Sequence, residues 1–166
     1  CIRDSSGCVG LGVASLVPGV RVKAVELSEQ ALSYLQSNIA RYPAFQVEAV
    51  QADVLRDAEL FPDKVQAILS NPPYIPPAEL PGLQREVRRE PVMALDGKEE
   101  DGLTFYRALA EHWLEKLLPG GFCAVEVGIG QAGSVAALWR QHGLTDIRIH
   151  RDLGNVERVV MGFAPR

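Results

Sequence analysis

The tetrapeptide Asn71-Pro72-Pro73-Tyr74 combines residue types that suit chemistry on a planar amino group. An amide or aromatic NH2 is a weak nucleophile because its lone pair is delocalised, and its two hydrogens need acceptors if that lone pair is to face an electrophile. Asn71 supplies a side-chain carbonyl and Pro72 a backbone carbonyl, and a proline removes the adjacent N–H donor. Tyr74 would lie across the planar face of the acceptor. The motif therefore predicts group transfer to an amino nitrogen, with Asn71, Pro72, Pro73 and Tyr74 as the catalytic residues.

A methyl group carried on a sulfonium suits this arrangement. An amide that has just been methylated is acidic enough to lose its proton to water, so no strong base is needed. Orientation for in-line attack supplies most of the effect, and the positive sulfonium could also favour the ring of Tyr74. We therefore expect S-adenosyl-L-methionine as cofactor and S-adenosyl-L-homocysteine as product.

A second group of residues could bind an adenosine. These residues follow two other predicted strands or lie in a glycine loop near the start of the chain. Ligands of open α/β sheets bind at the carboxyl ends of strands. There Glu26 can accept hydrogen bonds from ribose hydroxyls, Asp53 can accept from an adenine amino group with Val54 against the ring, and Gly7 lets the backbone approach the ligand. Each also has a local interpretation, with Gly7 as a plain turn, Asp53 as a helix cap and Glu26 as a solvated strand end. Glu26 by itself equally allows a dinucleotide, and the joint spacing favours adenosine.

Apolar periodicity alternates between short β-rich runs and longer helical stretches, which predicts an α/β domain with a mostly parallel sheet. Strands are expected at residues 20–26, 45–51, 64–70 and 121–127, and helices after Ser28, over 101–118 and over 130–142. The sequence Pro-Gly-Gly at 119–121 should end the second of these helices and form a turn. The runs 147–151 and 158–163 have no helix between them and should form an antiparallel hairpin at the sheet edge. Only four residues precede the loop that begins at Ser5, so the first strand should be truncated.

Length and charge narrow the class of protein. The 166 residues suit one domain and therefore one site. Seventeen basic against twenty-one acidic side chains give a net charge of −4, so no global field attracts a polyanion. A protein partner or small substrate fits better. Arg85, Arg88 and Arg89 form a local basic cluster, either a solvated helix face or a patch beside a substrate groove.

The cysteines Cys1, Cys8 and Cys123 are far apart and have neither zinc-site spacing nor a disulfide framework, so no metal is expected. The sequence contains no apolar run of transmembrane length and no signal-peptide pattern at its start. We expect a cytoplasmic protein with reduced thiols.

Beyond the tetrapeptide, the chain resembles the peptide chain release factor glutamine N5-methyltransferases over nearly all its residues. The resemblance implies a Rossmann-like class I methyltransferase fold, with a mostly parallel seven-stranded sheet and an antiparallel C-terminal hairpin. Residues 1–166 would form the catalytic domain, without the family's N-terminal helical domain. The matching segments are Asn-Pro-Pro-Tyr-Ile at 71–75, Arg-Glu-Pro at 89–91, Ala-Leu-Asp-Gly at 94–97, Asp-Gly-Leu at 101–103, Phe-Tyr-Arg at 105–107, Leu-Pro-Gly-Gly at 118–121, Glu-Val-Gly at 126–128 with Gln131, Asp-Leu-Gly at 152–154 and Arg-Val-Val at 158–160.

The resemblance also implies roles for single residues. The segment Asn71 to Tyr74 would bind the glutamine of the Gly-Gly-Gln motif in a release factor and promote transfer to its amide nitrogen. The methyl donor would be contacted by Ser5, Gly7, Glu26, Asp53, Val54 and Asn71. The partner would be a release factor, with no membrane and no nucleic acid as direct substrate.

The sequence leaves two alternatives to glutamine methylation open. A nucleic-acid amino methyltransferase would use the same tetrapeptide on a flipped base, although the acidic balance and the lack of a target-recognition domain weigh against it. The second is a domain that keeps the fold but has impaired donor binding. Residues 1–7 read Cys-Ile-Arg-Asp-Ser-Ser-Gly where the family has Asp-Leu-Gly-Thr-Gly-Ser-Gly or similar, so an acid and two glycines are replaced.

Overall fold

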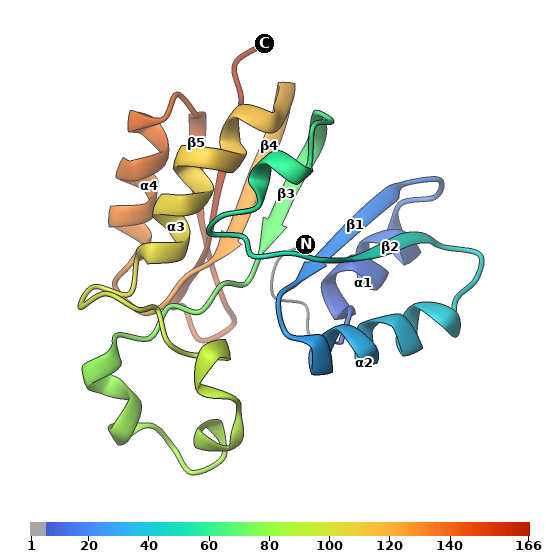
Figure 1. Ribbon diagram of the computed structural model, residues 1–166. Coiled ribbons are helices and arrows are strands. Elements are labelled where there is room, and N and C mark those ends of the chain that lie inside the picture. Colours follow the sequence, from blue (N-terminus) through green and yellow to red (C-terminus); the bar gives the residue numbers. More distant parts are fainter. Residues whose placement is uncertain (1–5) are drawn as a thin grey trace.

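The computed structural model describes residues 6–166, in which strands and helices alternate along the chain (Figure 1). Strands β1 (Arg21–Glu26) and β2 (Gln46–Gln51) pair in parallel, as do β3 (Val65–Ser70) and β4 (Leu117–Glu126). The last two strands, β5 (Thr145–Arg151) and β6 (Glu157–Phe163), form the expected antiparallel hairpin, with β5 at the edge of the order β3-β4-β6-β5. The α-helices are α1 (Cys8–Leu16), α2 (Glu29–Ala40), α3 (Thr104–Ala108) and α4 (Ala132–Gln141). The predicted α/β class is confirmed.

Helix α2 forms where the sequence predicts it because its first turn is capped and one face is apolar. The hydroxyl of Ser28 accepts a hydrogen bond from the backbone N–H of Ala31 at 3.3 Å. Leu32 and Leu35 are buried and pack with Ala24 of β1. The helix therefore covers the β1/β2 pair and fixes the direction in which the carboxyl end of β1 points (Figure 1).

The sheet is divided into two groups within the described residues. There β1 pairs only with β2, and β3 pairs only with β4, so six strands are present where seven were expected. In Figure 1 the β1/β2 pair with α1 and α2 stands apart from the group around β4. The truncated first strand was predicted ahead of the loop at Ser5, which lies outside the described residues.

The larger hydrophobic core lies on the β4 side and holds the exit of β2 in place. Trp113 and Trp139 are both buried in it, and the indole N–H of Trp113 donates to the Val54 carbonyl oxygen at 2.8 Å. Cys123 is fully buried there, and its burial raises the pKa of the thiol, so it serves as a small apolar residue. The loop after β2 is thereby anchored to the helical layer.

The predicted helix over residues 101–118 is wrong in its extent. It comprises α3, a π-helical turn at Leu109–Trp113 and a 3-10 turn at Leu114–Lys116, and then the chain enters β4. The Pro-Gly-Gly expected to end the helix instead lies inside β4, where Gly120 has a φ of 75°. It forms a bulge, because Val65 pairs with Leu117 and Ala67 with Phe122. No helix among the described residues is long and apolar enough to cross a membrane.

Candidate functional site

The segment Asn71 to Tyr74 leaves the carboxyl end of β3 with both of its predicted acceptors open. Pro72 and Pro73 are buried. The side-chain oxygen Oδ1 of Asn71 is also buried and has no hydrogen-bond partner among the described residues. No described group donates to the Pro72 carbonyl oxygen either. A buried acceptor without a donor is costly, by about 1–3 kcal/mol, so this pair marks a place where a ligand's N–H groups would be stabilising.

The ring of Tyr74 is fixed from the neighbouring strand. Its hydroxyl donates to Oε1 of Glu126, the last residue of β4, at 3.2 Å. The hydroxyl of Tyr106 donates to the Glu126 backbone oxygen at 2.8 Å. Burial, reinforced by Tyr74 and Glu126, raises the pKa of Tyr106, so this hydroxyl stays protonated. The tetrapeptide is therefore fixed at both ends, since Asn71 follows β3 directly and Tyr74 is bonded to the last residue of β4.

Gln131 joins three segments around the same tyrosine. Its Nε2 donates to the backbone oxygens of Tyr74 at 2.9 Å and Asp101 at 3.0 Å. Its Oε1 accepts from the N–H of Gly128 at 2.9 Å. Gly102 approaches closely as well, since a Cβ there would lie 2.2 Å from the Tyr74 carbonyl oxygen. One side chain therefore sets the backbone position of the residue that ends the motif.

The loop that carries Asp101 is held on its other side by Arg107. The guanidinium of Arg107 donates to both carboxylate oxygens of Asp101 and lies within ion-pair distance of Glu99. This contact, with the backbone N–H of Leu103, holds the pKa of Asp101 below its usual range. The Asp101 carbonyl is thus a fixed partner for Gln131.

Roles for Glu126, Gln131 and Gly102 were missed by the sequence reasoning, which noted these residues without assigning them a task. The signal for Glu126 was present, because it stands at the carboxyl end of a strand, as Glu26 does, and ligands of open α/β sheets bind at such ends. The contact of Gln131 with Tyr74 spans 57 positions in the sequence and had no local signal.

We expect Gln131→Glu to lower kcat by about tenfold or more, because the carboxylate would face two carbonyl oxygens that now receive N–H donors. Initial rates of methyl transfer, measured with a saturating donor, would check this. Gln141→Glu is the matched control, since it adds the same charge at an exposed position. An unchanged kcat in Gln131→Glu would contradict the positioning role.

Glu26 lies at the end of β1, as predicted, with one carboxylate oxygen committed. Its Oε1 accepts from the backbone N–H of Ser28 at 2.8 Å, and its side chain is half-buried. The other oxygen has no hydrogen-bond partner among residues 6–166. The N–H of Ala52 donates to the Glu26 backbone oxygen at 3.2 Å, so the exits of β1 and β2 lie side by side. Glu26 is therefore available to a ligand hydroxyl.

Asp53 is buried after β2 and uses its carboxylate within its own turn. Oδ1 accepts from the N–H of Leu55 and Oδ2 from Nε of Arg56, each at 3.0 Å. The local interpretation of Asp53 as a helix cap is wrong, because Asp53 precedes a turn and the next helical segment, at Ala58–Leu60, begins after Asp57. The Arg56 side chain is 81% exposed, so Oδ2 of Asp53 can exchange Arg56 for a ligand donor. Val54 is buried beside it and is placed through the Trp113 contact.

Gly7 closes the loop ahead of α1 in a backbone conformation that favours glycine. It has a φ of 81°, and a Cβ there would lie 2.8 Å from a methyl group of Leu35. The side-chain amide of Asn38 donates to the Ser6 backbone oxygen at 2.7 Å, which ties the loop to α2. Ser5 was also predicted to contact the donor and lies outside the described residues.

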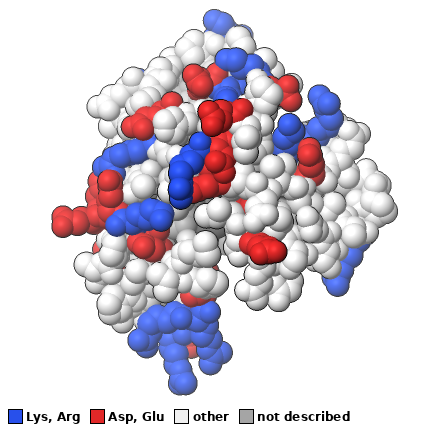
Figure 2. Space-filling model, in the orientation of Figure 1, with Lys and Arg blue, Asp and Glu red and all other residues white. Residues whose placement is uncertain are grey.

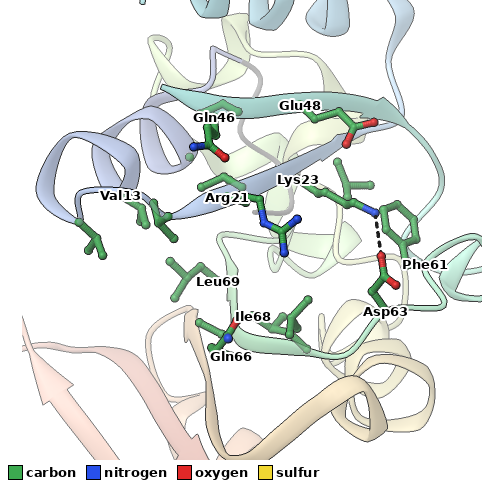
Figure 3. Close-up of a pocket in the computed structure, with 18 of the residues that line it drawn as sticks. Val13, Arg21, Lys23, Gln46, Glu48, Phe61, Asp63, Gln66, Ile68 and Leu69 are labelled. Atoms are coloured by element: carbon green, nitrogen blue, oxygen red, sulfur yellow. Dashed lines mark ion pairs between the residues drawn. The ribbon is translucent and has the colours of Figure 1, made fainter. Parts of the chain in front are cut away.

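A cavity of about 1170 Å³ lies away from the tetrapeptide, between β1 and β3 (Figure 3). Arg21 and Lys23 of β1 face Ile68 and Leu69 of β3 across it, and Lys23 pairs with Asp63 at 3.6 Å. None of the predicted site residues within 6–166 lines it. The cavity marks the interruption of the sheet, whereas the predicted site residues that the structure describes lie at or near the carboxyl ends of the strands and in the loop before α1.

The residues at those strand ends fit a nucleoside-type ligand beside an amino acceptor. Glu26 offers one open carboxylate oxygen, and Asn71 offers a buried oxygen without a partner in the described residues. Tyr74 supplies an aromatic face whose hydroxyl is already engaged. No group of three or more described histidine, cysteine or acidic side chains is placed to hold a metal ion.

The chain is similar in sequence to known methyltransferases. The family model described as "Methyltransferase small domain" matches residues 5–82. A release factor glutamine methyltransferase of Geobacter sulfurreducens is 40% identical over 162 residues, which cover 97% of this chain and 56% of that protein. Another, of Synechocystis sp., is 42% identical over 163 residues, covering 96% of this chain and 54% of that protein.

Solved structures show the same fold. A methyltransferase from Pyrococcus furiosus, 18% identical, superposes with a TM-score of 0.73 over 98% of this chain and 71% of that chain. A release factor-specific protein-(glutamine-N5) methyltransferase from Alicyclobacillus acidocaldarius is 26% identical, with a TM-score of 0.51 over 98% of this chain and 93% of that chain.

The fold is that of a class I methyltransferase domain. The curated relatives that match nearly the whole chain are named release factor glutamine methyltransferases. The chain spans about half the length of the curated relatives it matches, 56% and 54% for the two named above.

Proposed function

We propose that this chain carries the site that transfers a methyl group from S-adenosyl-L-methionine to the side-chain amide nitrogen of a glutamine. The observation that carries the proposal is the open acceptor pair formed by Asn71 and Pro72 after β3. A primary amide has two N–H groups and a planar face. Two neighbouring acceptors and an aromatic ring therefore fit a primary amide. They fit an ammonium less well, because an ammonium has three donors and no planar face.

The protein's part in the reaction is orientation. Asn71 Oδ1 and the Pro72 carbonyl oxygen accept from the amide's two N–H groups, which turns its nitrogen toward the electrophile. Tyr74, held by Glu126, lies against the planar face. The cofactor supplies a methyl group on a positively charged sulfur. Because the methylated amide is acidic, its proton passes to water, and no described histidine is required.

Glu26 would hold the donor's ribose hydroxyls through its open oxygen. Asp53 would accept from the adenine amino group after exchanging Arg56, and Val54 would pack on the ring. The loop with Ser5 and Gly7 would approach the amino-acid end of the donor, and Asn71 would contact both ligands. The residue types support these assignments, which remain part of the proposal.

The glutamine in question is that of the Gly-Gly-Gln motif in peptide chain release factors. Support comes from the names of the curated relatives, which are release factor glutamine methyltransferases. The net charge of −4 agrees with a protein acceptor better than with a polyanion. With that substrate, the reaction would take place in the cytoplasm, where translation ends.

Incubation with labelled S-adenosyl-L-methionine tests the proposal, with a bacterial release factor as acceptor. The control is the same release factor with its Gly-Gly-Gln glutamine replaced by glutamate. Label on the first protein and none on the second is the expected result. Equal label on both, or label transferred to DNA in place of protein, would refute glutamine as the acceptor.

Calorimetry with S-adenosyl-L-methionine distinguishes a loss of donor binding from a defect in acceptor binding, should no methyl transfer be seen. If the protein at millimolar donor shows no binding heat, the altered residues 1–7 have removed donor binding and the domain is not an enzyme as it stands. A measurable Kd without methyl transfer would instead place the fault on the acceptor side.

A further inference from the structure

Residues 76–95 form a lobe that projects from the acceptor site. It contains three short 3-10 helices, at Pro77–Gly82, Val87–Arg89 and Val92–Ala94, and no strand. In Figure 1 the lobe, in light green, extends away from the helices that cover β4. Its internal backbone hydrogen bonds connect residues close in sequence. The outer surface of the lobe is therefore not part of the hydrophobic core.

The base of this lobe is fastened directly beside the tetrapeptide. The N–H of Ile75 donates to the Leu95 oxygen, and the N–H of Gly97 donates to the Ile75 oxygen, both at 2.9 Å. Ile75 and Asp96 also form a parallel β-bridge, and Leu95 is buried. Ile75 follows Tyr74 in the chain. A protein that brings its glutamine to Asn71 and Tyr74 would therefore meet the lobe with the surface next to that glutamine.

The lobe presents an arginine face. Arg85, Arg88 and Arg89 are exposed, and within the described residues none of them forms an ion pair. In Figure 2 blue side chains gather at the end of the lobe, with little red surface between them. The lobe's three carboxylates belong to Glu79, Glu86 and Glu90, so its basic character lies in the placement of the arginines and not in a net charge.

Exposed apolar side chains lie in the same lobe. Val92 is 64% exposed and Met93 is 54% exposed, in the turn that follows the arginines. Arginine and methionine are enriched in protein interfaces, where an apolar centre is bordered by polar side chains. A nucleic-acid site would instead need a basic surface large enough to neutralise several phosphates. Three arginines on a protein of net charge −4 do not provide one.

We propose that the arginine face, defined as Arg85, Arg88 and Arg89 with Val92 and Met93, docks an acidic and partly apolar surface of the methyl-accepting protein. The inference rests on the proposed function, because the acceptor site determines which surface reaches the lobe. The docked surface flanks the accepting glutamine. A short glutamine peptide would therefore bind the acceptor site without using this face.

The variant R85E/R88E/R89E tests the docking surface, with R41E/R140E/R166E as matched control. The control reverses three exposed arginines on other elements and changes the net charge by the same amount. Two quantities are measured: the Kd for a full-length release factor at two salt concentrations, and the rate of methyl transfer to that protein and to a short Gly-Gly-Gln peptide.

For the lobe variant we expect a Kd and a KM for the release factor raised about tenfold or more, with a smaller salt dependence of binding. Its rate on the peptide should stay within about twofold of the wild type, as should all values of the control. An unchanged Kd in the lobe variant overturns the docking surface while the proposed function stands. If the lobe variant loses more affinity for a structured RNA than for the release factor, the face binds RNA and the protein-docking proposal is overturned.

The two proposals fail in different ways. If the unaltered protein methylates neither the peptide nor the release factor, the proposed function fails, and the Kd comparison alone then decides the docking surface. If it methylates the peptide but does not bind the full-length release factor, the docking surface fails alone.

Discussion

Replacing Asn71 by alanine is expected to lower methyl transfer by about 100-fold or more, the scale of removing one fixed hydrogen-bonding group from a preorganised site. The loss should appear in kcat, because the amide would still enter the site but one of its N–H groups would have no acceptor. Initial rates at saturating donor and acceptor measure it.

The same change should leave stability nearly unaltered. Asn71 Oδ1 is buried without a partner among the described residues, so its removal relieves a cost of about 1–3 kcal/mol that offsets the lost packing of the side chain. We expect the free energy of unfolding, from urea titration, to change by less than about 1 kcal/mol. A fall in activity without a fall in stability is typical of a residue kept for function.

Asn155→Ala is the control with the opposite expectation. Asn155 has a φ of 63° in the turn between β5 and β6, where alanine costs about 1 kcal/mol. It should lose stability and keep activity. If Asn71→Ala kept full activity, or lost stability in proportion to activity, the acceptor role of Asn71 would be wrong.

Gly102→Ala should be the most damaging change outside the tetrapeptide. The new Cβ would lie 2.2 Å from the Tyr74 carbonyl oxygen and 2.8 Å from Nε2 of Gln131, so one of them has to move. A displacement of about 1 Å at a reacting group costs about 100-fold in rate. We expect that loss in kcat, with a stability loss of about 2–4 kcal/mol from overpacking and positive φ together.

Gly143→Ala separates the two contributions to this loss. Gly143 has a φ of 86°, close to the 67° of Gly102, but a Cβ there would meet no atom within 4 Å. It should lose about 1 kcal/mol of stability and no activity. Equal effects of the two substitutions on kcat would show that strain at positive φ, and not the push on Tyr74, accounts for the loss.

Local chemistry in the sequence was enough to predict most of the strands and helices and to propose the acceptor motif. The cap at Ser28 and the apolar stripe of α2 depend on neighbours three and four residues apart, so they can be read without a structure. The same is true of the antiparallel hairpin at the C-terminus. The resemblance to release factor glutamine methyltransferases was also predictable from the ordered motifs after Asn71, and the names of the curated relatives confirm that resemblance.

What the tertiary structure decided is how the tetrapeptide is held. Glu126 and Gln131 reach Tyr74 from β4 and from the loop before α4, over separations of 52 and 57 residues. Such contacts follow from the pairing of β3 with β4, and no local pattern encodes them. The bulge at Pro119 to Gly121 was likewise misread as a helix stop, because the same residue types serve both. Asn71 to Tyr74 could thus be singled out from residue types alone. The open acceptors and the fixed ring that support it as a candidate site could be seen only in the fold, because they depend on contacts between distant parts of the chain.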